Sequence, residues 1–133
     1  VLPLAGLHLL LAEDNELNSE IATTLLEEQG ASITAVENGR LALEAIRNAV
    51  PHTYDAILMD VMMPEMNGLE ATRCIRAFEG KGPGEGTPII AMTANVFADD
   101  VKACLDAGMN SHIGKPLDMK VLIGEILKYT DAR

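Results

Sequence analysis

Short apolar runs alternate with longer amphipathic segments along this chain of 133 residues. The runs carry few polar positions, a pattern typical of strands that are buried on both faces of a parallel sheet. They predict five strands, over 8–12, 32–36, 55–60, 88–93 and 111–114.

The segments between these runs repeat apolar residues at a spacing of three or four, which predicts helices with one buried face. The helices are expected over 16–29, 40–50, 68–77, about 98–107, and from Asp118 onward. Residues that favour helix starts precede them, namely Asn15, the pairs Asn38-Gly39 and Asn67-Gly68, and Asp118 itself. Gly30 and Pro51 are predicted to end the first two helices.

Five strand–helix units of this kind predict an α/β fold, with a five-stranded parallel sheet covered by helices on both faces. No linker divides the chain, so a single domain over 1–133 is expected. The segment 80–86, GKGPGEG, contains four glycines and one proline and is expected to be a flexible loop.

Charge and cysteine content narrow the possible functions. The chain has 10 basic and 20 acidic residues, for a net charge of -10, which argues against a nucleic-acid partner or an anionic membrane surface. Cys74 and Cys104 lack metal-binding spacing and are expected to be free thiols in a reducing compartment. No apolar run approaches the 18 residues that would indicate a transmembrane helix. The short apolar start without an initiator Met suggests a piece of a larger chain.

Polar residues stand at the carboxyl ends of four of the five predicted strands, where parallel sheets bind their ligands. These residues are Glu13 and Asp14 after the first strand, Asp60 after the third, Thr93 after the fourth and Lys115 after the fifth. The second strand ends in Val36-Glu37 and contributes nothing obvious to this rim. Each residue alone has a simpler explanation as a helix cap, a turn residue or a surface lysine, but those explanations do not predict that all of them share one edge.

Three carboxylates in one crevice repel one another, and a hard divalent cation relieves that repulsion. Mg²⁺ prefers one or two carboxylates together with water and phosphate oxygens, and the ammonium of Lys115 is then left for an anion. A cation, a lysine and a hydroxyl around Asp60 form a phosphoryl-transfer constellation in which Asp60 is the nucleophile. The residues therefore predict a phosphoacceptor.

The motifs LLAEDN, ILMDVMMPEMNG, IIAMTAN and HIGKPL together resemble the receiver (response-regulator) domain, with the match running from about Gly6 to Tyr129. The residues within these motifs are most similar to those in the receivers of hybrid sensor histidine kinases. The resemblance implies a flavodoxin-like fold with strand order 2-1-3-4-5, and a domain that catalyses its own phosphorylation and dephosphorylation. It also implies a cytoplasmic location, possibly within a membrane-anchored histidine kinase.

For the site, the resemblance implies that Asp60 is phosphorylated and that Asp14 ligates Mg²⁺ directly. Glu13 would act mostly through water, and the backbone carbonyl of Met62 would complete the protein's share of the coordination. The first helix, through Leu17, Ile21 and Asn18, would face a partner. That partner would be the phosphohistidine domain of a kinase or a histidine phosphotransfer protein, with no nucleic acid and no direct membrane contact.

The resemblance also implies that Thr93 hydrogen-bonds one phosphoryl oxygen and that Lys115 pairs with another. It further implies that the Lys115-Pro116 peptide bond is cis. Two positions depart from the family pattern. The switch position, usually Tyr or Phe, is His112, so the expectation is either a weaker or different relay from Thr93 or a partly exposed histidine with no switch role. Met62, two residues beyond Asp60, cannot position a water for attack, so slow self-dephosphorylation is expected.

Three alternative functions differ from this one in the residues they need. Haloacid-dehalogenase-like phosphatases require a second aspartate where Met62 stands, and flavin-binding modules require a Ser/Thr-rich phosphate loop that is missing after the first strand. A receiver-like interaction module that is never phosphorylated is the remaining alternative. Such modules typically lack the aspartate or the lysine, and both are present here.

Overall fold

The sheet has five parallel strands in the order β2-β1-β3-β4-β5, as the resemblance implied. The computed structural model describes residues 2–94 and 98–130. The strands are β1 (His8–Ala12), β2 (Ser32–Val36), β3 (Ala56–Asp60), β4 (Ile89–Thr93) and β5 (Ser111–Gly114). β4 begins one residue later than predicted, because Pro88 has no backbone N–H to donate to the ladder. Only its carbonyl pairs, accepting from the Ile57 N–H at 2.8 Å.

The five helices are α1 (Glu16–Glu28), α2 (Gly39–Asn48), α3 (Gly68–Glu79), α4 (Ala98–Ala107) and α5 (Met119–Thr130). The side chains of Asn15, Asn38 and Asn67 cap the first three, each accepting the N–H of the residue three positions on at 2.8–2.9 Å. Asp118 caps α5 through the Lys120 N–H at 2.9 Å. These four predicted caps are confirmed.

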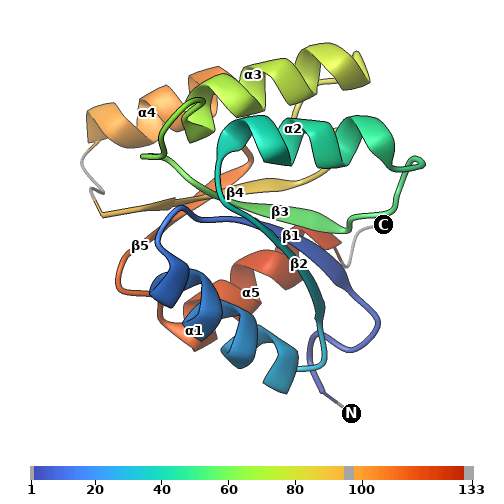
Figure 1. Cartoon of the computed structure of the whole chain (residues 1–133), viewed down its shortest axis with the longest axis vertical. Coiled ribbons are helices and arrows are strands. Elements are labelled where there is room, and N and C mark those ends of the chain that lie inside the picture. Colours follow the sequence, from blue (N-terminus) through green and yellow to red (C-terminus); the bar gives the residue numbers. More distant parts are fainter. Residues whose placement is uncertain (1, 95–97, 131–133) are drawn as a thin grey trace.

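Helices cover both faces of the sheet, with α1 and α5 on one side and α2, α3 and α4 on the other (Figure 1). Successive side chains of β1 pack alternately into the hydrophobic layers on the two faces of the sheet, since strand side chains alternate between faces. Leu9 and Leu11 pack under α1 and α5, whereas Leu10 packs in the opposite layer. Almost all of β1 and all of β3 and β4 are buried, which explains their continuous apolar runs.

Two segments show how the sequence pattern is realised. In α1 Ala22 and Leu26 are buried, while Leu17 and Ile21 are 64% and 49% exposed, which leaves them accessible for the partner contact expected of this helix. Residues 80–86 form a loop between α3 and β4, as expected, and within it the Gly86 N–H donates to the Gly82 carbonyl at 2.9 Å.

Two further findings concern the described residues as a whole. Cys74 and Cys104 are free, as expected. Within residues 2–94 and 98–130, none of the helices has the length and apolar character that crossing a bilayer requires.

Candidate functional site

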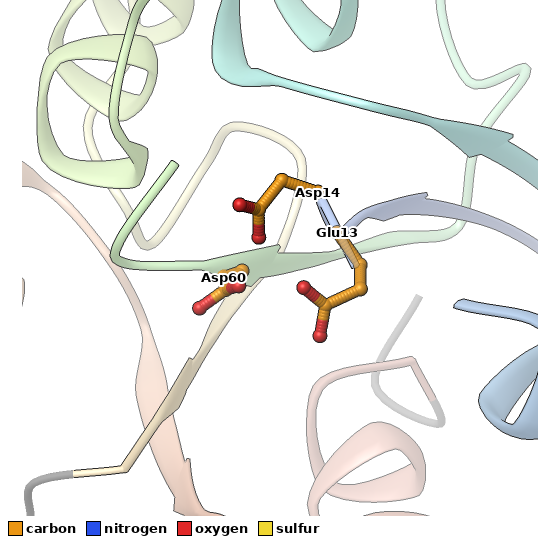
Figure 2. A group of neighbouring side chains, drawn as sticks. All are labelled: Glu13, Asp14 and Asp60. Carbon is orange, nitrogen blue, oxygen red and sulfur yellow. The ribbon is translucent and has the colours of Figure 1, made fainter. Parts of the chain in front are cut away.

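Three carboxylates meet at the carboxyl edge of the sheet (Figure 2). Glu13 and Asp14 follow β1 directly, and Asp60 is the last residue of β3. Because β1 and β3 are paired neighbours, with Ala12 opposite Met59, the two strand ends bring these side chains together. One ligand oxygen from each lies within 4.8 Å of the others. Glu13 and Asp60 are each only 5% exposed, whereas Asp14 faces solvent.

Lys115 joins this cluster from the loop after β5. Its Nζ donates to Glu13 Oε1 at 3.1 Å and lies 3.2 Å from Asp60 Oδ2. The Lys115 backbone N–H donates to the Thr93 carbonyl at 2.8 Å, which ties this loop to the end of β4. The Lys115-Pro116 peptide bond is cis, as predicted. The arrangement sets one ammonium group against two buried carboxylates.

The charges of this cluster are not balanced. Burial, and after it the hydrogen bond and negative charge of Glu13, together raise the pKa of Asp60 to about 7 against the opposing effect of Lys115. Burial acts to raise the pKa of Glu13 as well, but its hydrogen bonds with Asp60, Lys115 and the Asn15 N–H outweigh burial and lower it. The pKa of Lys115 is raised, since its two carboxylate partners outweigh its burial. At neutral pH the crevice therefore holds surplus negative charge.

The donor set of this crevice fits Mg²⁺. All three side chains offer hard carboxylate oxygens, and Mg²⁺ binds such oxygens at about 2.1 Å in an octahedron, so opposite ligands lie roughly 4 Å apart. The three ligand oxygens lie within 4.8 Å of one another, a separation comparable to that of ligands around one ion. The three carboxylates are therefore close enough to serve one Mg²⁺ ion together with water.

The remaining predicted residues lie on or beside the same edge. Thr93 ends β4 and is 7% exposed, in the strand that pairs with β3. Met62 is two residues beyond Asp60, and its side chain is 77% exposed. His112 is half-buried in β5 and pairs with Ala91, two residues before Thr93. The structure thus gathers Glu13, Asp14, Asp60 and Lys115 in direct proximity and places the other three around them.

One contributor was missed at the end of β2. The Val36 carbonyl accepts the backbone N–H of Glu13 at 3.1 Å, so this strand end holds the acidic pair in place although it offers no side chain to the crevice. As expected, β2 delivers no polar side chain to the crevice, and its contribution is this backbone contact alone. The signal was the strand order, because β2 is the outer neighbour of β1.

A flavodoxin-like sheet with an acidic crevice and a lysine at its carboxyl edge defines a phosphoacceptor class of signalling domain. The family model described as the response regulator receiver domain matches residues 9–127. The chain therefore belongs to the receiver domain family, which confirms the resemblance seen in its motifs.

The comparisons connect the chain with sensor kinases. It is 41% identical to Probable histidine kinase 1 of Oryza sativa subsp. indica over 84% of this chain, but spans only 14% of that relative. The receiver domain of a sensor histidine kinase from Pseudomonas aeruginosa, solved with a magnesium ion in its active site cleft, is 37% identical with a TM-score of 0.82. This match covers 96% of this chain and 99% of that one.

A third match is the receiver domain of the Saccharomyces cerevisiae response regulator Ssk1, co-crystallised with the histidine phosphotransfer protein Ypd1. It is 25% identical with a TM-score of 0.85, and the match covers 96% of this chain and 91% of that one.

Proposed function

We propose that Asp60 accepts a phosphoryl group from a phosphohistidine and that the chain is a phosphorelay receiver. The observation that carries this proposal is the Lys115 ammonium held between Glu13 and Asp60, with Asp14 completing a three-carboxylate cation site. Asp60 stands at a strand end with a pKa of about 7 and with other carboxylates beside it. A bound metal ion would compensate this negative charge.

Each residue has a defined role in the proposed transfer. Asp14, Asp60 and the Met62 carbonyl would hold Mg²⁺, with Glu13 acting mostly through water, and the ion would supply positive charge that stabilises the phosphoryl oxygens. A carboxylate oxygen of Asp60 forms the new bond to phosphorus while the phosphorus–nitrogen bond to the donor imidazole breaks. The imidazole nitrogen keeps the electron pair and takes up a proton.

Two further residues hold the transferred group. The Thr93 hydroxyl donates to one phosphoryl oxygen, and the Lys115 ammonium pairs with another. We propose that the movement of Thr93 toward the phosphoryl group is transmitted to His112 and changes the surface around β5. The effect is weaker than with Tyr or Phe at position 112.

The partner surface lies beside the crevice on α1. A groove of about 540 Å³ runs between α1 and the loop after β5, with Ile21, Leu25, Lys115 and Leu117 among its lining residues. Leu17 and Ile21 leave apolar area exposed beside it. An apolar helix face next to the phosphoryl acceptor suits a histidine-bearing helix of a kinase or phosphotransfer protein. The complex of the Ssk1 receiver with Ypd1 supports this choice.

The remaining proposals concern the whole protein. Residues 1–133 act as one receiver domain, and the relatives that it matches support a place within a hybrid sensor histidine kinase. We propose that the domain works in the cytoplasm, alone or as the cytoplasmic part of a membrane-anchored kinase.

Intact-mass spectrometry tests the proposed chemistry. The protein is incubated with Mg²⁺ and acetyl phosphate, with Asp60→Asn as the matched variant. One phosphoryl group on the parent and none on Asp60→Asn is the expected result. If the parent gains no phosphoryl group from acetyl phosphate or from a phosphorylated histidine-kinase domain, the proposal fails and the interaction module takes its place.

A further inference from the structure

The loop between β3 and α3 carries Met62 and has an unusual conformation. Glu65 adopts φ +63°, in the left-handed region that residues with a side chain rarely occupy. The loop is closed at its base by the Gly68 N–H, which donates to the Val61 carbonyl at 3.0 Å. Its conformation needs support from outside, because a non-glycine residue is rarely stable there on its own.

That support comes from the start of α2. Arg40 Nε donates to Glu65 Oε2 at 3.2 Å, and Asn38 Nδ2 donates to the same oxygen at 3.3 Å. The Gly39 N–H donates to the Met66 carbonyl at 2.9 Å. Three consecutive residues of one segment thus hold two consecutive residues of the loop.

The two segments also touch closely. A Cβ added at Gly39 would overlap the Met66 carbonyl oxygen and would lie 2.8 Å from Ala71 Cβ. Real Cβ atoms essentially never approach other atoms so closely, and the obstructing oxygen is backbone, so the loop would have to move. Glycine at position 39 is what allows α2 to seat against the loop.

The same segment reaches the other half of the crevice. Val36, at the end of β2, accepts the Glu13 N–H at 3.1 Å, while residues 38–40 hold Glu65 and Met66. One short stretch of chain, residues 36–40, is therefore hydrogen-bonded both to the acidic pair and to the β3–α3 loop. This stretch offers no side chain to the metal site.

We propose that residues 36–40 form a positioning clamp that sets the β3–α3 loop, and with it the Met62 carbonyl, against the carboxylates for Mg²⁺. The clamp rests on the proposed function, since it acts through the metal site. Its members are positioning residues: they orient the groups around a metal ligand and take no part in the transfer. Such outer contacts commonly change metal affinity when they are removed.

Calorimetric titration of the full chain with Mg²⁺ at pH 8 tests the clamp, with thermal melting to establish folding. We expect Arg40→Ala to weaken Mg²⁺ binding about threefold, a small effect because the pair is exposed. Gly39→Ala should weaken it about tenfold because the loop itself is displaced. Arg40→Lys should recover part of the loss.

Two matched variants separate the clamp from ordinary helix stability. Glu44→Gln removes the other ion pair of Arg40, at 3.1 Å within α2, without touching the loop, and should leave Mg²⁺ affinity unchanged. Asn38→Ser keeps a capping oxygen for α2 but loses the donor to Glu65, so it should weaken binding about threefold at an unchanged melting temperature.

The outcomes distinguish the clamp from the function on which it rests. If the parent binds Mg²⁺ and both Arg40→Ala and Asn38→Ser bind it equally well, the clamp is refuted while the phosphoacceptor proposal stands. Those two variants also decide the matter if Gly39→Ala does not fold. If the parent itself binds no Mg²⁺, the proposed metal site and the clamp are both refuted.

Discussion

Two cations are held at opposite ends of the sheet, and their surroundings differ. Arg76, in α3, is 9% exposed and donates to the carbonyls of Gly108 and Thr87 at 2.9 and 2.8 Å, and to Asn110 Oδ1 at 2.9 Å. It also pairs with Glu79 at 3.0 Å. Three neutral acceptors and one carboxylate satisfy one guanidinium, so the charges are balanced.

Lys115, at the other end, faces two buried carboxylates with a third nearby. Burial, and after it the hydrogen bond and charge of Glu13, raise the pKa of Asp60 to about 7, because the single ammonium of Lys115 offsets them only in part. Thr87 and Asn110 precede β4 and β5, whereas Lys115 follows β5, so one end of the sheet is closed by satisfied hydrogen bonds and the other is left with charge for a ligand. A polar network whose charges and hydrogen bonds are satisfied stabilises the fold. A network with uncompensated charge is typical of a functional site.

The largest effect on stability is expected from Arg76→Met. It leaves the Glu79 carboxylate, 14% exposed, without its cation, and it removes the guanidinium donor from the Gly108 and Thr87 carbonyls, while Asn110 Oδ1 keeps the Ile89 N–H. We expect the free energy of unfolding to fall by about 3 kcal/mol. Urea unfolding measures the change. Arg73→Met, at an exposed position of the same helix, should change it by less than about 0.5 kcal/mol. A loss below about 1 kcal/mol for Arg76→Met would remove the contrast between the two ends.

Lys115→Met should show the opposite pattern, with a large effect on chemistry. Removing the ammonium leaves a phosphoryl oxygen without a charged partner, and loss of one such donor typically slows transfer about 100-fold. The rate of phosphoryl uptake by intact mass tests this, with Lys120→Met as an exposed control in α5. We expect the loss of unfolding free energy to be smaller than for Arg76→Met, since Asp60 can take up a proton instead. Uptake at the parent rate would contradict the role given to Lys115.

The same contrast explains what could be predicted from sequence. Strands and their polar ends were predictable because apolar periodicity is local and because parallel strands bring their carboxyl ends to one edge. The Arg76 network was not, since Arg76 and Asn110 are 34 residues apart and no local pattern links them. The contacts of Asn38 and Arg40 with Glu65 were hidden for the same reason. In α1 the pattern marked an apolar stripe but not which edge of it would be exposed, because that depends on how the helix seats on the sheet.

Acidification should weaken Mg²⁺ binding, because a proton and the ion compete for Asp60. With a pKa of about 7 in the metal-free protein, apparent affinity should be about tenfold lower at pH 6 than at pH 8. The stability change has the opposite sign. A raised pKa in the folded state stabilises the metal-free fold most below about pH 4, and this contribution is lost as the pH rises through 7.

Titration calorimetry at the two pH values, with Asp60→Asn as the control, checks this pH dependence. The variant has no carboxylate to protonate at position 60 and should bind more weakly but with a flatter pH dependence. An equal affinity of the parent at pH 6 and pH 8 would show that Asp60 does not compete with the metal for a proton.

Among the changes that compare the two ends of the sheet, the smallest effect is expected at Met62, the exposed side chain closest in sequence to Asp60. Its apolar group, 77% exposed, cannot hydrogen-bond a water for attack on the acyl phosphate, whereas an amide can. We expect Met62→Asn to shorten the lifetime of the phosphoryl group about fivefold, the effect of roughly one added hydrogen bond. The decay of the phosphorylated mass after removal of the donor measures it.

Met62→Leu is the matched control and should keep the slow decay, since it changes shape without adding a donor or an acceptor. If Met62→Asn lost its phosphoryl group no faster than the parent, the lifetime would be set elsewhere in the crevice. Because the side chain of Met62 is largely in solvent, neither variant should change the free energy of unfolding by more than about 0.5 kcal/mol. A change in lifetime without a change in stability is what a residue at the charged end of the sheet should produce, and Arg76 at the balanced end should produce the reverse.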